Sequence, residues 1–150
     1  MNLTQNVKTK RIQPDGSGYT VAAGTTDVNS DIVDTAGFEG VRFIVAWGAI
    51  VSGAVTSFKV QQNDVNSATG MADLTGSNIT VADTDDNKLS ITDIFKPRER
   101  YIRLAFDRGT QNATIDGVIV ELYEPRTLPV TQDTTVQSAE QWVSPAEGTA

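Results

Sequence analysis

The densest group of side chains that could bind a ligand is Asp83–Asn87, where three aspartates and an asparagine fall within five residues. Calcium takes about six to eight oxygen ligands, and an acidic loop between strands can supply them. The spacing does not match the EF-hand loop, which needs a glycine and a terminal glutamate at fixed positions. Two interpretations stay open: a solvated turn between strands, or a calcium loop of unfamiliar spacing.

The chain offers few side chains that could act in catalysis, because it contains no histidine and no cysteine. The commonest general base and the commonest transition-metal ligand are therefore missing. Ser-His-Asp and Cys-His nucleophilic schemes are excluded. Glu99 and Glu121 are the carboxylates that could form a glycosidase pair, but Arg100 and Arg103 offer them ordinary ion-pair partners. We expect no enzyme activity, no catalytic residue and no cofactor.

The balance of charge limits the partners. Twelve basic and nineteen acidic residues give a net charge of −7, which opposes binding to nucleic acid and to anionic membranes. Lys8, Lys10 and Arg11 form a small basic cluster, which fits either nucleic acid or an acidic protein surface. No apolar signal segment follows them, and the apolar stretch 41–51 is too short to span a bilayer. We expect synthesis in a cytoplasm and binding to neither nucleic acid nor membrane.

Strand-like alternation dominates the middle of the chain. Apolar and other residues alternate with period two, the repeat of side chains along a β-strand. The clearest segments are 41–49, 58–61, 89–92, 101–106 and 118–123, and weaker ones are 20–23, 30–35 and 79–81. The predicted core is Phe43, Val45, Trp47, Phe58, Val60, Leu74, Leu89, Ile91, Ile102, Leu104, Phe106, Val118, Val120 and Leu122.

Turn-forming clusters of Gly, Asn, Asp and Ser separate these segments, which is typical of a sandwich or barrel. We predict an all-β, antiparallel two-sheet sandwich of about seven or eight strands. Its topology should be jelly-roll-like, with an immunoglobulin-like sandwich as the second choice. Residues 30–124 should form the body, while the polar segments 1–29 and 125–150 should form an N-terminal and a C-terminal arm.

Apolar residues in outward-facing positions are the candidates for an interface. If the core set above points inward, Ile44, Ile119 and Tyr123 point outward. Exposed apolar side chains of this kind mark a contact with a partner or lie beneath an arm of the same chain. Ordering a polar arm costs about 1–2 kcal/mol per residue, which contacts must offset. We expect arms that grip neighbouring subunits, with Leu128, Val130 and Trp142 as anchors.

Four segments carry a resemblance to a known group of proteins: 33–39 (VDTAGFE), 58–64 (FKVQQND), 100–104 (RYIRL) and the final strand 117–123. Together they resemble small virion structural proteins of tailed bacteriophages and prophages, of the head decoration or cement type. The resemblance covers about residues 30–124. It implies a β-sandwich in the virion, on the capsid surface, with the major capsid protein as partner and no catalysis. A homotrimer would match the local threefold positions of a capsid.

Two other functions stay open beside capsid decoration. One is a structural component of the tail or of the head-to-tail junction. The other is a carbohydrate-binding β-sandwich, which would need exposed aromatic rings on one face. The aromatic residues considered for that role are Trp47, Tyr101, Tyr19, Tyr123 and Trp142.

Overall fold

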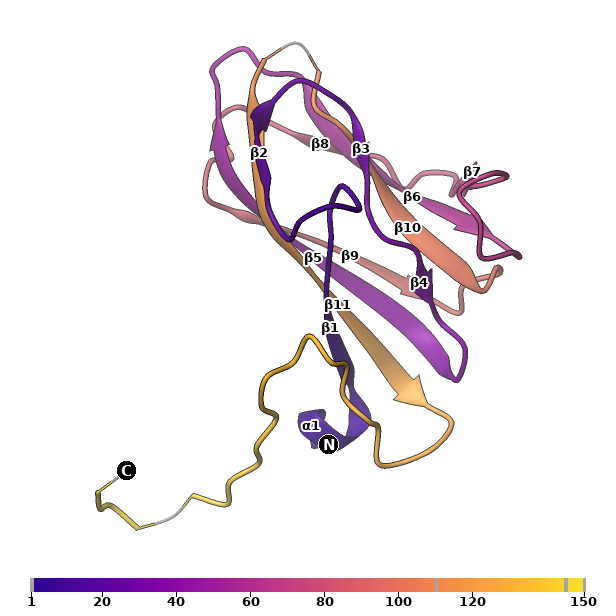
Figure 1. Cartoon of the computed structure of the whole chain (residues 1–150), viewed down its shortest axis with the longest axis vertical. Coiled ribbons are helices and arrows are strands. Elements are labelled where there is room, and N and C mark those ends of the chain that lie inside the picture. The colour runs from indigo at the N-terminus through magenta and orange to yellow at the C-terminus, as the bar shows by residue number, and fades with distance from the viewer. Residues whose placement is uncertain (1, 110, 145, 150) are drawn as a thin grey trace.

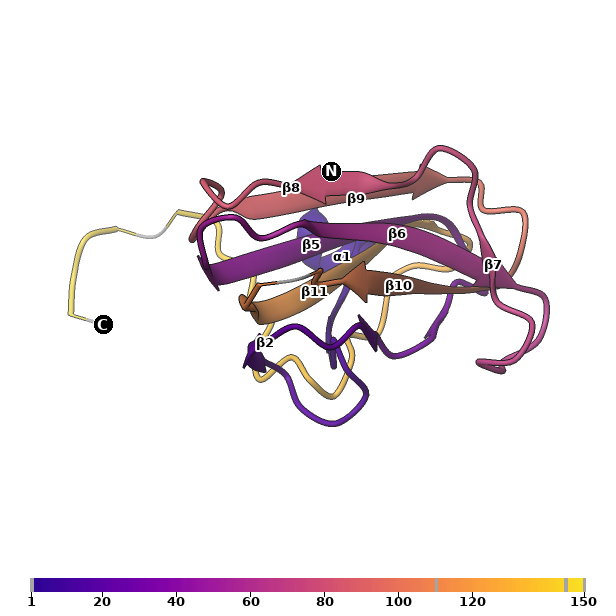
Figure 2. The same cartoon turned by 90° about the horizontal axis from the view of Figure 1, so that it is seen from above.

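Two antiparallel β-sheets, packed face to face, make up most of the computed structural model (Figures 1 and 2). The structure describes residues 2–109, 111–144 and 146–149. A short helix, α1 (Leu3–Asn6), precedes the strands. The first sheet contains β1 (Lys8–Ile12), β2 (Val21–Gly24), β5 (Phe38–Ile50), β9 (Leu89–Phe95) and β11 (Ala113–Pro125). The second contains β3 (Val28–Asn29), β4 (Val33–Asp34), β6 (Thr56–Asn63), β7 (Ala72–Asp73), β8 (Ile79–Val81) and β10 (Tyr101–Asp107).

The strand order confirms the predicted fold class. The first sheet runs β1-β11-β5-β9, and β2 also pairs with β11. The second sheet runs β3-β10-β6-β7, with β4 also on β10 and β8 also on β6. The first long strand thus lies beside the last, and the chain crosses repeatedly between sheets, which is the jelly-roll arrangement. The strand count exceeds the prediction because several strands are only two or three residues long.

The core lies between the sheets, and three aromatic rings occupy its centre. Trp47 on β5 is 6.1 Å from Phe58 and 6.0 Å from Phe106, measured between ring centroids. The indole N–H of Trp47 donates to the hydroxyl of Ser90 on β9, so its one polar atom is satisfied. Trp47 is buried and therefore cannot serve as an exposed aromatic ring for binding carbohydrate.

Two predicted core residues, Leu89 and Ile91, lie instead on the solvent side of the first sheet. On β9 it is Ser90, Thr92 and Ile94 that face the core, where they are half-buried. Period-two alternation separates the two faces of a strand but does not say which face is buried. Leu74, also predicted for the core, is half-buried against it.

The N-terminal segment is part of the sandwich rather than an arm. β1 pairs with β11 from Lys8 to Ile12, and β2 pairs with the start of β11. Ile12 is fully buried and belongs to the hydrophobic core. The prediction of an arm over 1–29 was wrong here because an edge strand of this sheet needs only one deeply buried side chain and reads as polar.

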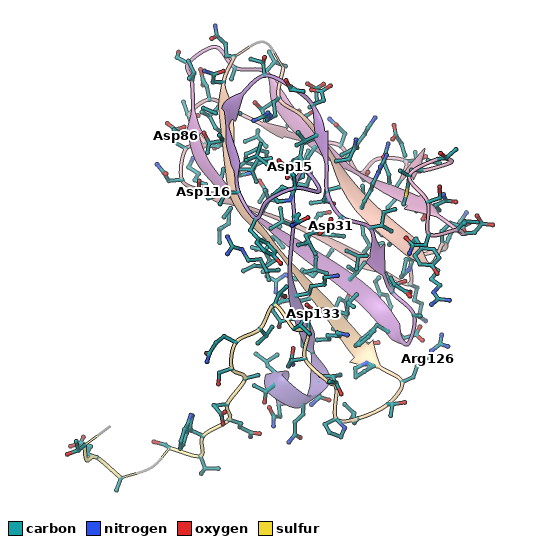
Figure 3. All side chains as sticks on the ribbon, in the orientation of Figure 1. Asp15, Asp31, Asp86, Asp116, Arg126 and Asp133 are labelled. Atoms are coloured by element: carbon teal, nitrogen blue, oxygen red, sulfur yellow. The ribbon has the colours of Figure 1, made fainter. Side chains whose placement is uncertain are left out.

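The C-terminal segment divides at about residue 136. Its first part lies along the outer edge of β1, where Gln132 Oε1 accepts from the backbone N–H of Thr9 and Thr135 Oγ1 accepts from that of Arg11. Beyond this point the chain leaves the sandwich as an extended segment (Figure 1). Figure 3 shows the side chains past Asp133 lying progressively farther from the sheets.

Candidate functional site

The outer face of the first sheet carries a row of isoleucines that crosses three strands. Ile119 on β11 pairs with Ile44 on β5, and Ile44 pairs with Ile91 on β9. Side chains at paired positions on one face lie about 4.5–5.5 Å apart, so neighbours in the row are in contact range. In the next row Ala46 pairs with Leu89. We call these five residues the apolar face.

The apolar face is open to solvent. Leu89 is 63% exposed, Ile91 48% and Ile119 42%, whereas Ile44 and Ala46 are half-buried between them. A shallow groove of about 570 Å³ runs over this surface. Contiguous exposed apolar surface on a soluble protein marks an interaction site more often than scattered single residues do.

An ion pair borders the apolar face. Arg42 on β5 forms a 3.1 Å ion pair with Glu121 on β11, the position beside it in the sheet. Neutralisation within the pair lowers the cost of covering this rim with a partner. The arrangement is therefore apolar in the middle and polar at the margin, as in the buried centre and rim of protein interfaces.

A pair of aromatic rings lies at the far end of the same face. The Tyr123 ring leaves β11 and covers Gly40 of β5, where a Cβ atom would fall 2.0 Å from Tyr123 Cζ. It stacks on Phe95 of β9 with an 8° angle between ring planes and 6.4 Å between centroids. Burial, followed by the carboxylate of Asp93, raises the pKa of Tyr123 to about 12.

The sequence-predicted interface residues separate into two groups. Ile44, Ile119 and Tyr123 lie together on the outer face of the first sheet, as their alternation predicts. Leu128 is exposed in the turn after β11, and Val130 is half-buried, with its backbone N–H bonded to the carbonyl of Gln5. Trp142 lies far along the extended C-terminal segment.

Three residues of the site were missed by sequence reasoning: Leu89, Ile91 and Phe95, all on β9. The signal was present, since all three share one parity with Asp93, a charged residue that belongs on the solvent side. A charge in register with apolar residues favours assigning that parity to the outer face.

The acidic cluster at Asp83–Asn87 has a structural use. Asp83 accepts from the backbone N–H of Gly53 at 2.7 Å, and Asp85 accepts from that of Ala82 at 2.9 Å. Asp86, labelled in Figure 3, accepts from the N–H of Ile50 at 2.5 Å. The carboxylates thereby hold this turn against the end of β5. Within the described residues, no group of three or more His, Cys, Asp or Glu side chains is placed to hold a metal ion.

Comparisons with known proteins give distant likenesses only. No family model and no curated protein matches the chain. Among solved structures, it is similar to chitosan-binding module 1 of a chitosanase/glucanase from Paenibacillus sp. IK-5, at 19% identity and TM-score 0.41, over 80% of this chain and 98% of that one. It is also similar to a chain of infectious bursal disease virus, Gt strain, at 11% identity and TM-score 0.26, over 82% of this chain and 32% of that one. TM-scores this low carry no information about function.

No helix among the described residues is long and apolar enough to cross a membrane.

Proposed function

We propose that the protein is a structural virion protein that attaches to the surface of a tailed-phage capsid through the apolar face of its first sheet. The observation that carries the proposal is the row Ile119, Ile44 and Ile91, which together with Leu89 forms contiguous apolar surface on the solvent side of the first sheet. Removing apolar surface of this kind from water lowers the free energy, so its contact with another protein is stabilising.

The energetics suit a protein that acts in many copies. Covering one partly exposed Ile or Leu contributes on the order of 1 kcal/mol, since full burial is worth about 1.5–3 kcal/mol. A few such side chains give modest affinity for one copy. Attachment to a repeating capsid lattice multiplies that contact, especially for an oligomer that engages several sites together.

The identity of the partner rests on the sequence. Segments 33–39, 58–64, 100–104 and 117–123 resemble head decoration and cement proteins, which implies the major capsid protein as partner. The net charge of −7 favours a basic or apolar counter-surface over nucleic acid or membrane. The proposed role is mechanical and non-catalytic: a homotrimer on the capsid surface that bridges neighbouring subunits and resists internal pressure.

The experiment mixes purified protein with expanded empty capsids and measures bound protein by sedimentation and imaging. The full chain should bind at regular positions. The double variant Ile44→Asp/Ile119→Asp should lose binding, because two charges would have to be buried at the contact. Val65→Asp, which adds a charge at an exposed apolar loop residue, is the matched control and should bind normally. Equal binding by all three proteins would refute the proposed surface.

A tail or head-to-tail location is the structural alternative, and it uses the same apolar face. A location map of the protein on intact particles separates the two. Density over the capsid shell supports decoration, and density confined to the portal or tail supports the alternative.

Carbohydrate binding is the second candidate, and the Tyr123–Phe95 pair is the observation that favours it. Two nearly parallel rings on an open sheet face offer the flat apolar surface on which a sugar ring can stack. A glycan array tests this function. Hits lost in Phe95→Ala would support it, and an array without hits would remove it.

A further inference from the structure

The two edges of the first sheet differ in how their outward backbone groups are covered. At the β1 edge, side chains of Gln132 and Thr135 cover the outward backbone N–H groups. At the opposite edge lies β9, which pairs with β5 on one side and with no other strand among the described residues. Proteins usually protect a bare edge with proline, lysine, a bulge or a covering segment, because its free backbone groups bind other extended chains.

The register shows which backbone groups are free on β9. Trp47 N–H donates to the Lys88 carbonyl, and Lys96 N–H donates to the Glu39 carbonyl. In an antiparallel pair, hydrogen-bonded positions alternate along the strand. The even-numbered residues of β9 therefore bond to β5, and the backbone groups of Leu89, Ile91, Asp93 and Phe95 point outward.

The side chains of β9 also favour the addition of another strand at this edge. Leu89, Ile91 and Phe95 are exposed on the outer face, and no proline or lysine interrupts Leu89–Phe95. Asp93 is its only charged residue, and its carboxylate accepts the hydrogen bond of Tyr123. An added strand here would find free backbone partners and an apolar surface together.

The extended C-terminal segment carries two apolar side chains that are largely exposed among the described residues. Trp142 is 75% exposed and Val143 is 89% exposed. Residues just before them are held beside α1: Ala139 and Glu140 line a groove with Leu3, and Gln141 accepts a hydrogen bond from Asn2. α1 leads directly into β1, at the edge opposite β9. Trp142 is thus carried away from the β9 edge of its own chain.

We infer that residues 142–144 of one copy, directly after the part held beside α1, add as a short strand along β9 of a second copy. Trp142 then covers Leu89 and Ile91 and leaves Ile44, Ala46 and Ile119 open to the capsid. In such a strand Trp142 lies on the outer face and Val143 on the inner one, on the side of the half-buried Ser90 and Thr92. The contact is head-to-tail, because it joins different surfaces of the two copies. Such contacts close into a ring when the rotation from each copy to the next adds up to a full turn. The inference deepens the proposed function, on which it rests for an assembly of several copies, and a ring of three copies would match the proposed homotrimer.

Complementation between two full-length variants tests the inference. Leu89→Asp/Ile91→Asp breaks the edge and keeps the segment, while Trp142→Asp/Val143→Asp breaks the segment and keeps the edge. By analytical ultracentrifugation the natural chain should form trimers, and each variant alone should associate about thirtyfold more weakly or worse, as for loss of a central anchor. An equimolar mixture should form a one-to-one dimer, because one intact contact remains. Val65→Asp is the control and should behave as the natural chain.

Several outcomes would overturn the inference. They are a monomeric natural chain at all concentrations, unchanged association of the Trp142→Asp/Val143→Asp variant, or no complex in the mixture. A blue shift of the Trp142 fluorescence that is the same at every protein concentration would show that Trp142 docks within its own chain. That result would also overturn the inference. All substituted residues are exposed, so each variant should fold. A melting curve checks this. If the edge variant fails to fold, Leu89→Lys replaces it.

The proposed function is tested separately with the same proteins. Ile44→Asp/Ile119→Asp should lose capsid binding and keep self-association. Self-association without capsid binding by the natural chain would contradict the proposed function alone, and capsid binding by a strict monomer would contradict the inference alone.

Discussion

The hydroxyl group of Tyr123 donates a 2.7 Å hydrogen bond to Oδ1 of Asp93, and to do so the Tyr123 side chain extends across strand β5. Tyr123 belongs to β11 and Asp93 to β9, so one side chain spans three strands of the first sheet. The bond holds the ring flat over Gly40 and beside Phe95. It thereby shapes one end of the surface through which we propose that the protein docks.

Alkaline titration should reveal this bond. The pKa of Tyr123 is raised to about 12, first by burial and then by Asp93. The folded state therefore holds the phenolic proton more tightly than the unfolded state, whose pKa is about 10. The stability this provides is present below about pH 10 and is lost as the pH rises toward 12. Asp93→Asn should lower the pKa of Tyr123 measured by tyrosinate absorbance, with Tyr123→Phe identifying the signal; an unchanged value would refute the role of Asp93.

Gly40→Ala should displace the Tyr123 ring. The new Cβ would lie 2.0 Å from Cζ, so the ring has to move and the bond to Asp93 breaks. We expect a loss of about 1 kcal/mol in the free energy of unfolding and loss of the contacts between the Tyr123 and Phe95 rings in NMR spectra. Gly117→Ala is the matched control, because its Cβ meets nothing closer than 3.7 Å. Equal effects of the two substitutions would contradict the prediction.

Arg108 should be a large contributor to stability. Its guanidinium is buried and donates to the carbonyl oxygens of Thr26, Ala22 and Ala113, which ties the β2–β3 connection to β11. Arg108→Met leaves these oxygens without their donor and should cost about 3 kcal/mol in chemical denaturation. Arg108→Lys should recover only part of it, because an ammonium group lacks the planar fork of donors. Full recovery by lysine would show that charge alone matters.

Gln132→Ala should open the β1 edge. The side chain accepts from the N–H of Thr9 and donates to the carbonyls of Thr4 and Val7, at 2.8, 3.0 and 2.7 Å. Without it the Thr9 amide should exchange with solvent about tenfold faster, equivalent to about 1.4 kcal/mol. Gln137→Ala, farther along the same segment, is the control. Unchanged exchange at Thr9 would mean that backbone contacts alone hold the segment.

The sequence was informative where a strand carries large side chains on its buried face. The alternation around Phe43 and Trp47 in β5, and around Val118 and Val120 in β11, predicted the long central strands and the outward positions of Ile44 and Ile119. The jelly-roll prediction was confirmed as well. These features follow from side-chain parity and from turn residues, both of which are local.

What the sequence could not provide depends on partners distant in the chain. β1 is a strand because β11, more than a hundred residues later, supplies its hydrogen bonds, and its own composition is polar. The two faces of β9 differ too little in hydrophobicity to show which is buried. Arg108 reads as a surface charge until the three carbonyl oxygens around it are known.

The most direct test of the account is a map of the protein bound to capsids, at a resolution that shows side chains. In that map Ile44 and Ile119 of the first sheet should lie within about 4.5 Å of apolar atoms of a capsid subunit. A map in which the protein is bound but this face points to solvent would contradict it.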